Sequence, residues 1–118
     1  MKILVIDDHP TVRQMTIRLL ACLGHTPLEA RDAAEAEATL SDEVEVILID
    51  LHLDGADGGA LAGRLEARRS GVHILFMSGV GQDVFAAREL GGPRRGFIEK
   101  PFSLNRLNDA LQTLLVPP

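Results

Sequence analysis

Three short, mostly apolar runs, each ended abruptly by a polar residue, constrain the fold of this chain more than any other feature of its sequence. The runs cover residues 3–6, 44–49 and 72–77. Each is short and rich in Val, Ile and Leu, which is typical of strands that are buried on both faces. The sequence therefore predicts a parallel sheet whose central strands are covered by helices on both sides.

Segments with helical patterns alternate with these strands, and two weaker strands complete the series. The weaker strands are expected at residues 26–30, where Pro27 favours an edge of the sheet, and at residues 96–99. Apolar residues at helical spacing, with capping residues at several starts, predict helices at residues 10–24, 32–40, 58–69, 84–90 and 103–115. Five strand–helix units predict an α/β, doubly wound (βα)5 fold that uses residues 1–118 as a single domain.

Composition narrows the functional class. The chain has 118 residues and a formal net charge of −5, and this acidic balance argues against binding to a nucleic-acid backbone. No apolar run is long enough to span a bilayer and no signal peptide is evident, so we expect a soluble, cytoplasmic domain without membrane contact. Cys22 is the single cysteine, which excludes an internal disulfide, and its leucine neighbours predict a buried, unreactive thiol.

Polar residues follow four of the five predicted strands, always at the carboxyl end. They are Asp7, Asp8, Asp50, Ser78 and Lys100. Because parallel strands point the same way, these side chains are expected along one edge of the sheet, where doubly wound folds bind their ligands. Polar residues are common at strand ends and often have no joint function. That alternative explains each residue singly, but it does not explain well why three acids, one hydroxyl and one ammonium gather here.

The grouped acids predict a divalent cation. Three carboxylates at one edge repel one another unless a positive charge intervenes, and an oxygen-rich, solvent-open site suits Mg²⁺. Ca²⁺ is the alternative, but the acids lack the tight spacing of an EF-hand loop.

Lys100 offers a compact ammonium that can approach one phosphoryl oxygen. His9 could influence the approach of a metal, although a role at the start of a helix is the simpler expectation.

Taken together, these motifs resemble those of the response-regulator receiver domains of two-component signalling. The resemblance rests on Asp7-Asp8, Asp50, Ser78-Gly79 and Lys100-Pro101-Phe102, in this order and at this spacing, and it covers the whole chain. The family implies a flavodoxin-like, five-stranded parallel sheet of order 2-1-3-4-5. That architecture agrees with the one expected from the apolar runs.

The resemblance also implies roles for the acids. Asp50 matches the phosphoacceptor of the family, Asp8 matches the direct Mg²⁺ ligand, and Asp7 matches the acid that holds metal-bound water. The family's third protein ligand is a backbone carbonyl two residues after the phosphoacceptor, which is His52 here. We therefore expect Mg²⁺, with Mn²⁺ as a substitute, and a phosphoryl group transferred to Asp50 from a histidine kinase or a histidine phosphotransfer protein.

The remaining matches concern the response to phosphorylation. Ser78 matches the hydroxyl that binds the phosphoryl group, Lys100 matches the lysine that pairs with the acceptor, and Phe97 matches the aromatic switch position. The family implies binding to a downstream protein, or a homodimer, through the face that comprises the predicted helix 84–90, the strand 96–99 and the last helix. Apart from its own phosphorylation and dephosphorylation, no enzyme activity is expected.

Three other functions deserve comparison. A haloacid-dehalogenase-like phosphatase wants a second acid two residues after its nucleophile, and His52 stands there instead. A pseudo-receiver that never carries phosphate usually lacks the acids or the lysine, whereas this chain has both. A flavodoxin-like electron carrier wants aromatic rings and a phosphate loop, which are not evident. The parent protein is expected to be a free-standing receiver, a hybrid sensor kinase or a longer regulator.

Overall fold

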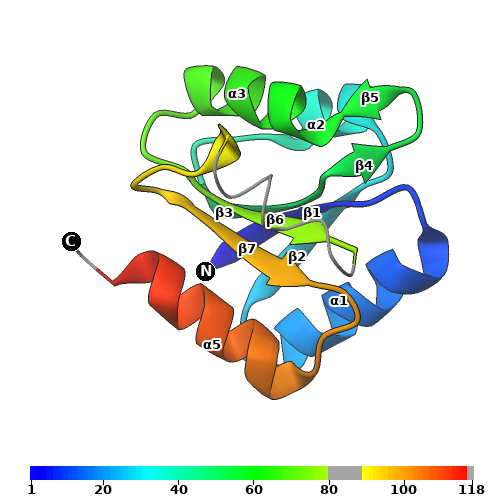
Figure 1. Ribbon diagram of the computed structural model, residues 1–118, viewed down its shortest axis with the longest axis vertical. Coiled ribbons are helices and arrows are strands. Elements are labelled where there is room, and N and C mark those ends of the chain that lie inside the picture. Colours follow the sequence, from blue (N-terminus) through cyan, green and yellow to red (C-terminus); the bar gives the residue numbers. More distant parts are fainter. Residues whose placement is uncertain (80–88, 117–118) are drawn as a thin grey trace.

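The computed structural model describes residues 1–79 and 89–116 and is built on a five-stranded parallel sheet. The strands lie in the order β2-β1-β3-β6-β7 (Figure 1). Their bounds are β1 Lys2–Ile6, β2 Thr26–Ala30, β3 Val44–Asp50, β6 His73–Ser78 and β7 Arg95–Glu99. Since β6 and β7 are the fourth and fifth strands of this sheet along the chain, the predicted order 2-1-3-4-5 is confirmed. The edge position of β2, which contains Pro27, is confirmed as well.

The helices cover the sheet on both faces, as Figure 1 shows. Helices α1 (Pro10–Cys22) and α5 (Leu104–Leu115) lie on one face, and α2 (Ala33–Thr39) and α3 (Gly58–Arg68) lie on the other. Most of the predicted helix at 84–90 lies outside the described residues. Its last two residues, 89 and 90, are described and are helical. In the part of the chain that the structure describes, no helix is long and apolar enough to cross a membrane.

Alternating residues of the central strands build two separate cores. In β1, Leu4 and Ile6 pack into the core beneath α2 and α3, while Ile3 and Val5 pack into the core beneath α1 and α5. All four side chains are fully buried. Strands with no solvent-facing side must be apolar at every position, which is why the uninterrupted run at residues 3–6 predicted this architecture.

The helix starts follow the predicted capping chemistry. The Asp32 side chain accepts a hydrogen bond from the backbone N–H of Glu35 at the start of α2, and the Ser103 hydroxyl accepts one from Arg106 at the start of α5. These bonds satisfy amide groups that the first helical turn leaves without partners.

Two local features differ from the sequence-based expectations. A short antiparallel hairpin of β4 (His52–Leu53) and β5 (Ala56–Asp57) follows β3, and two-residue strands are too short to show any hydrophobic period. Cys22 is exposed rather than buried. The reason is helical geometry, because Leu20 takes the core position and a residue two places further on points to a different side of the helix.

Gly58 connects the fold to Asp50 through a close backbone contact. A Cβ atom at Gly58 would lie 2.2 Å from the Asp50 carbonyl oxygen and 2.9 Å from the Leu51 Cα. Both are backbone atoms in or beside a buried strand, and they have little freedom to move away. The start of α3 can therefore pack against the end of β3 only if this position has no side chain.

Replacing Gly58 with Ala is expected to lower the free energy of unfolding by about 1–3 kcal/mol, the usual range for overpacking a tight site. The matched control is Gly63→Ala in the same helix, where a Cβ meets nothing within 4 Å. There the gain in helix propensity should raise the free energy of unfolding by about 0.5–1 kcal/mol. Urea denaturation measures both changes, and equal effects of the two variants would contradict the proposed clash.

Candidate functional site

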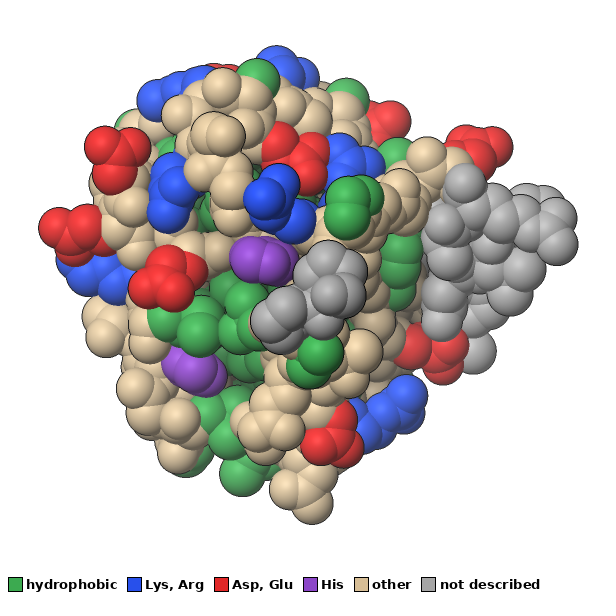
Figure 2. Space-filling view, turned by 90° about the vertical axis from the view of Figure 1, so that its left-hand side faces the viewer, with side chains coloured by type: hydrophobic (Ala, Val, Ile, Leu, Met, Phe, Trp, Pro, Cys, Tyr) green, Lys and Arg blue, Asp and Glu red, His purple; other side chains and the backbone are tan. Residues whose placement is uncertain are grey.

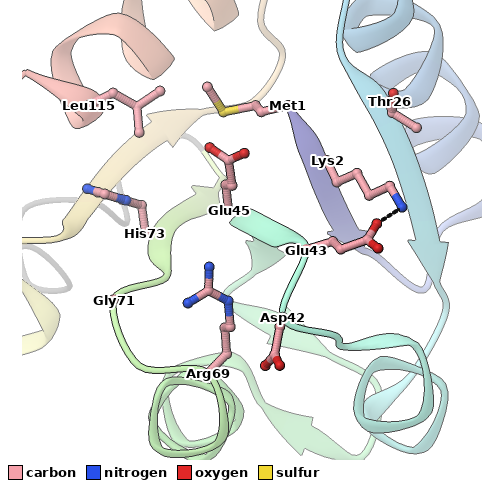
Figure 3. A pocket seen from close by; sticks show the side chains of 10 residues that line it. All are labelled: Met1, Lys2, Thr26, Asp42, Glu43, Glu45, Arg69, Gly71, His73 and Leu115. Carbon is pink, nitrogen blue, oxygen red and sulfur yellow. Dashed lines mark hydrogen bonds and ion pairs between the residues drawn. The ribbon is translucent and has the colours of Figure 1, made fainter.

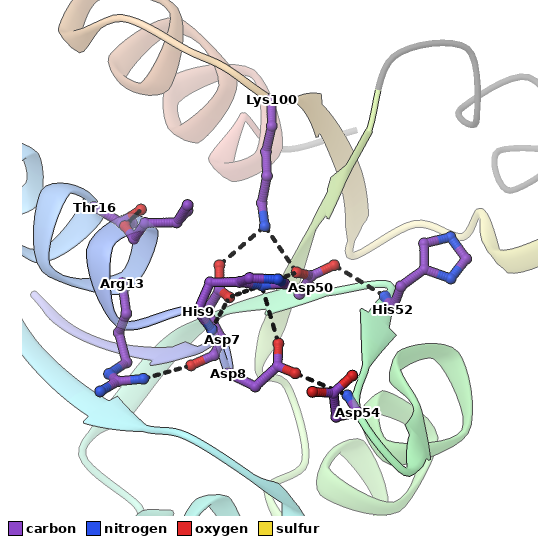
Figure 4. Close-up of polar contacts among 10 residues, drawn as sticks. Asp7, Asp8, His9, Arg13, Thr16, Asp50, His52, Asp54 and Lys100 are labelled. Carbon is purple, nitrogen blue, oxygen red and sulfur yellow. Dashed lines mark hydrogen bonds and ion pairs between the residues drawn. The ribbon is translucent and has the colours of Figure 1, made fainter.

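Asp7, Asp50 and Lys100 meet at the carboxyl edge of the sheet, where the sequence predicts a site (Figure 4). The Lys100 ammonium donates one hydrogen bond to Asp50 Oδ2 at 2.7 Å and another to Asp7 Oδ2 at 3.0 Å. Asp7 follows β1, Asp50 ends β3, and Lys100 follows β7. The parallel sheet thus brings together residues that are up to 93 positions apart in the chain.

Burial makes this contact electrostatically demanding. Asp7 is fully buried, and Asp50 is 5% exposed. Burial alone disfavours the charged form of Lys100, but its hydrogen bonds to Asp50 and Asp7, together with their negative charges, outweigh that effect and raise the pKa of Lys100 above its ordinary value. The ammonium therefore stays charged throughout the physiological pH range.

Asp8 lies beside this pair and is held by the hairpin. Its Oδ2 accepts a 3.0 Å hydrogen bond from the backbone N–H of Asp54. Its Oδ1 is buried and has no hydrogen-bond partner among residues 1–79 and 89–116. Burial opposes ionisation of Asp8, but the Asp54 hydrogen bonds, with a further contribution from the nearby His9, lower the pKa of Asp8 below its ordinary value.

The His9 side chain lies among the same carboxylates. The sequence favoured a role at the helix start for this residue over a role at the metal. His9 is the N-cap of α1, as expected, yet its side chain makes no capping hydrogen bond. Its Nδ1 instead lies 3.2 Å from Asp8 Oδ1 and 3.3 Å from Asp7 Oδ1. Figure 4 shows the imidazole ring between these acids and Asp50.

This arrangement fits a divalent cation. Asp7, Asp8, His9 and Asp50 each offer one ligand atom, and these four atoms lie within 4.8 Å of one another. The buried Asp8 Oδ1 without a hydrogen-bond partner is an acceptor that a cation would satisfy. The cluster could therefore hold a metal ion, and its three carboxylates are hard oxygen donors, which suit Mg²⁺ or Mn²⁺.

His52 contacts Asp50 through its backbone. Its N–H donates a 2.9 Å hydrogen bond to Asp50 Oδ1, and its ring points away from the carboxylates in Figure 4. Asp50 therefore has a fixed orientation, with one oxygen held by the hairpin and the other by Lys100. That the His52 carbonyl binds a metal stays a prediction.

Ser78 and Phe97 lie on the β6–β7 side of the site. The backbone N–H of Lys100 donates a 2.7 Å hydrogen bond to the Ser78 carbonyl, which ties the lysine to the end of β6. The Ser78 hydroxyl is buried and has no partner among the described residues. Phe97 is partly buried and stacks on Phe76, with ring centroids 5.3 Å apart.

Sequence reasoning missed two residues that support the site. The Arg13 guanidinium donates a 2.8 Å hydrogen bond to the Asp7 carbonyl, and Asp54 holds Asp8 through its backbone amide. Arg13 lies one turn into a helix that starts beside Asp7, so its position on that helix was a usable signal. The backbone amide of Asp54 carries no side-chain signal and could not have been found.

Arg95 has a structural role across the β6–β7 side of the sheet. It pairs with Glu66 on α3, its guanidinium carbon lies 5.6 Å from the centre of the Phe76 ring, and it donates a hydrogen bond to the Leu90 carbonyl at 2.8 Å. The ion pair with Glu66 raises the pKa of Arg95. The side chain thus links α3, β6 and β7.

A hollow at the opposite, amino edge of the sheet has different chemistry. It has a volume of about 620 Å³, and opposite charges already pair within it, as Lys2 does with Glu43 (Figure 3). Arg69 donates to the Val44 carbonyl there. Figure 2 shows this edge from outside, with acidic and basic side chains intermixed around histidine and apolar ones. None of the predicted site residues lines this hollow.

Comparison with known proteins identifies the family. The family model for the response regulator receiver domain matches residues 3–112. The chain belongs to this family. The match includes every residue of the acidic cluster together with Ser78, Phe97 and Lys100, and receiver domains are phosphoacceptor signalling modules of two-component systems. Homologues occur both in sensor kinases and in transcriptional regulators.

Two curated relatives resemble this chain in sequence, and a solved structure resembles it in both sequence and fold. The chain is 29% identical to the sensor kinase CckA of Brucella abortus over 96% of its own length but 12% of that protein. It is 31% identical to the positive alginate biosynthesis regulatory protein of Pseudomonas aeruginosa over 95% of its length and 46% of that protein. The crystal structure of the receiver domain of NtrX from Brucella abortus matches with a TM-score of 0.83 and 30% identity, covering 96% of this chain and 97% of that one. The chain thus spans half or less of these two full-length relatives.

Replacing Lys100 with Met should lower the free energy of unfolding of the metal-free protein by about 1.5–3 kcal/mol, because two hydrogen bonds to buried carboxylates are lost. The folded state raises the pKa of Lys100 above 10.5. The stabilisation is therefore complete below pH 10.5 and is lost as the pH rises through the folded-state pKa. The difference between wild type and variant should be constant from about pH 7 to 10 and shrink above that.

Urea denaturation in the presence of a chelator measures this difference. The matched control is Lys2→Met, because Lys2 is the other lysine and pairs with Glu43 at an exposed site. Exposed pairs contribute at most about 1 kcal/mol. A Lys2 variant as destabilised as the Lys100 variant would contradict the role given to the buried ammonium.

Proposed function

We propose that residues 1–118 act as one receiver domain in which Asp50 accepts a phosphoryl group from a phosphohistidine. The observation that carries this proposal is the double contact of Lys100 with Asp50 and Asp7, in a chain of the receiver family. A structural salt bridge needs one acid, whereas here one ammonium lies against two carboxylates with a third beside them. Such a concentration of charge is costly for stability and is typical of functional sites.

The transfer step uses the carboxylate of Asp50 as the nucleophile. One of its oxygens forms the P–O bond while the P–N bond to the donor imidazole breaks, and the imidazole nitrogen takes the electron pair. Lys100 neutralises charge on the phosphoryl oxygens, and the His52 N–H fixes the carboxylate orientation. Bound Mg²⁺, or Mn²⁺ in its place, supplies further charge neutralisation; Asp7, Asp8, Asp50 and the His52 carbonyl would hold it.

Ser78 and Phe97 provide the conformational response. Phosphorylation adds about −1.5 to −2 charge units at Asp50. The buried Ser78 hydroxyl, which has no partner among the described residues, is available to donate to the new phosphoryl oxygens. Its movement opens space into which Phe97 can shift from its stack on Phe76. Phosphate at one strand end is thereby coupled to the surface of β7.

Phosphorylation of Asp50 and the response of Ser78 and Phe97 imply two kinds of partner. A histidine kinase or a histidine phosphotransfer protein supplies the phosphoryl group. A downstream protein, or a second copy, binds the face made by β7, α5 and residues 84–90, the last of which lie mostly outside the described residues. The domain catalyses no reaction besides its own phosphorylation and dephosphorylation, acts in the cytoplasm, and contacts neither nucleic acid nor membrane. The parent is a free-standing receiver, a hybrid sensor kinase or a longer regulator.

Incubation with acetyl phosphate or phosphoramidate and Mg²⁺ should add the mass of one phosphoryl group to the wild type and none to Asp50→Asn. Intact-mass spectrometry measures the product, and omission of Mg²⁺ should abolish it. The matched control is Asp42→Asn at the opposite edge of the sheet, which should be phosphorylated like the wild type. Phosphorylation of Asp50→Asn would refute the proposal. So would a wild type that stays unmodified with both small donors and with autophosphorylated histidine kinases.

Beryllofluoride, which mimics an aspartyl phosphate, should shift the backbone amide resonances of Ser78 and Phe97 in the presence of Mg²⁺. In Ser78→Ala, beryllofluoride should still perturb Asp50, but the shift at Phe97 should fall strongly because the hydroxyl that couples the two is missing. Amide NMR spectra of both proteins test this. A full Phe97 response in Ser78→Ala would contradict the coupling and leave the phosphoacceptor role intact.

A further inference from the structure

His9 is placed at the acidic site by its backbone and does not need its side chain for the helix. Its N–H donates a 2.9 Å hydrogen bond to Asp7 Oδ1, and its carbonyl accepts the first helical hydrogen bond of α1, from Arg13. The imidazole makes no capping bond. The ring is therefore not needed by the helix. Its Nδ1 makes a 3.3 Å hydrogen bond with Asp7 Oδ1, and Figure 4 shows it turned toward the carboxylates.

The distances from the His9 ring fit atoms that share one ion. Nδ1 lies 3.2 Å from Asp8 Oδ1, 3.3 Å from Asp7 Oδ1 and 4.0 Å from Asp50 Oδ2. With metal–ligand bonds of about 2.1 Å, ligand atoms at right angles lie roughly 3 Å apart and opposite ones roughly 4.2 Å apart. The three distances fall in or close to this range.

The hydrogen bonds around the site also favour this role. Both oxygens of Asp50 accept hydrogen bonds, Oδ1 from His52 and Oδ2 from Lys100. Asp7 Oδ2 accepts one from Lys100. Asp8 Oδ2 accepts one from Asp54. Asp8 Oδ1 is buried and has no hydrogen-bond partner among the described residues, yet it is the carboxylate oxygen nearest to the imidazole nitrogen. A cation bound between these two atoms would give Asp8 Oδ1 a partner and would replace the hydrogen bond of the imidazole nitrogen to Asp7 Oδ1.

We propose that His9 is a direct nitrogen ligand of the divalent ion at this site and sets its preference among metals. The inference rests on the metal site of the proposed function and adds a ligand to it. Oxygen ligands alone suit Mg²⁺, whereas an imidazole favours later transition metals, whose affinity for nitrogen rises from Mn²⁺ through Co²⁺ to Ni²⁺. The site therefore accepts Co²⁺ and Ni²⁺ more readily than an all-oxygen receiver site does.

Calorimetric titration of the chain with Ni²⁺, Co²⁺ and Mg²⁺ tests this selectivity. Since loss of even an indirect partner of a metal ligand weakens binding about 10–100-fold, His9→Ala should weaken Ni²⁺ and Co²⁺ binding at least tenfold. Mg²⁺ affinity should change about twofold or less, because Mg²⁺ readily keeps a water in place of a ligand. The matched control is His73→Ala, a histidine that lines the hollow at the opposite edge of the sheet, which should leave all three affinities unchanged. Equal loss for all three metals, or no loss for any, overturns the proposal.

A second measurement on the unaltered chain does not depend on the folding of a variant. Zn²⁺ titration followed by ¹⁵N NMR of the histidine rings should shift one ring nitrogen of His9 to the position of a metal-bound nitrogen, in a one-to-one complex. A His9 ring that keeps its shifts while the Asp8 amide responds overturns the proposal. Phosphorylation of the wild type by acetyl phosphate with Mg²⁺, and its absence in Asp50→Asn, tests the phosphoacceptor role without any change at His9, so the two proposals can fail independently.

Discussion

The contact of one ammonium with two buried carboxylates is the interaction on which the organisation of the site depends. Lys100 reaches Asp7 and Asp50 because the strands before these residues, β7, β1 and β3, run in the same direction and end at the same edge. A buried carboxylate without a partner is strongly unfavourable. The parallel register therefore has an electrostatic role in addition to its hydrophobic one, because any strand that slipped would separate the lysine from its acids.

The remaining contacts keep this edge rigid. Arg13 holds the backbone of Asp7, Asp54 holds Asp8, and His52 holds Asp50. Each of these donors belongs to a segment that directly follows a strand, and two of the three use backbone amides. Backbone donors cannot rotate away, so the acids are held in place before any ligand arrives, which lowers the reorganisation needed for binding and transfer.

Much of the fold and the centre of the site could be predicted from the sequence because both depend on burial. The run at residues 3–6 predicted a strand covered on both faces, and the polar residues after four of the five strands predicted the edge where Asp7, Asp50 and Lys100 meet. The hairpin of β4 and β5, the direction of the His9 ring and the contacts of Arg95 could not be predicted. The hairpin strands are two residues long, and the His9 ring and Arg95 depend on individual hydrogen bonds and ion pairs, so none of the three leaves a periodic signal in the sequence.

The order of the charges along the chain has a consequence for biosynthesis. Asp7, Asp8 and Asp50 all precede Lys100, so a nascent chain that ends after β6 carries the three carboxylates without the ammonium that bridges two of them. Domains are synthesised from the N-terminus, so Lys100 becomes available only after all three of these acids. Docking of β7 then completes the sheet and neutralises its edge in the same step. A product truncated before the last strand–helix unit would therefore be destabilised both in its packing and in its charge.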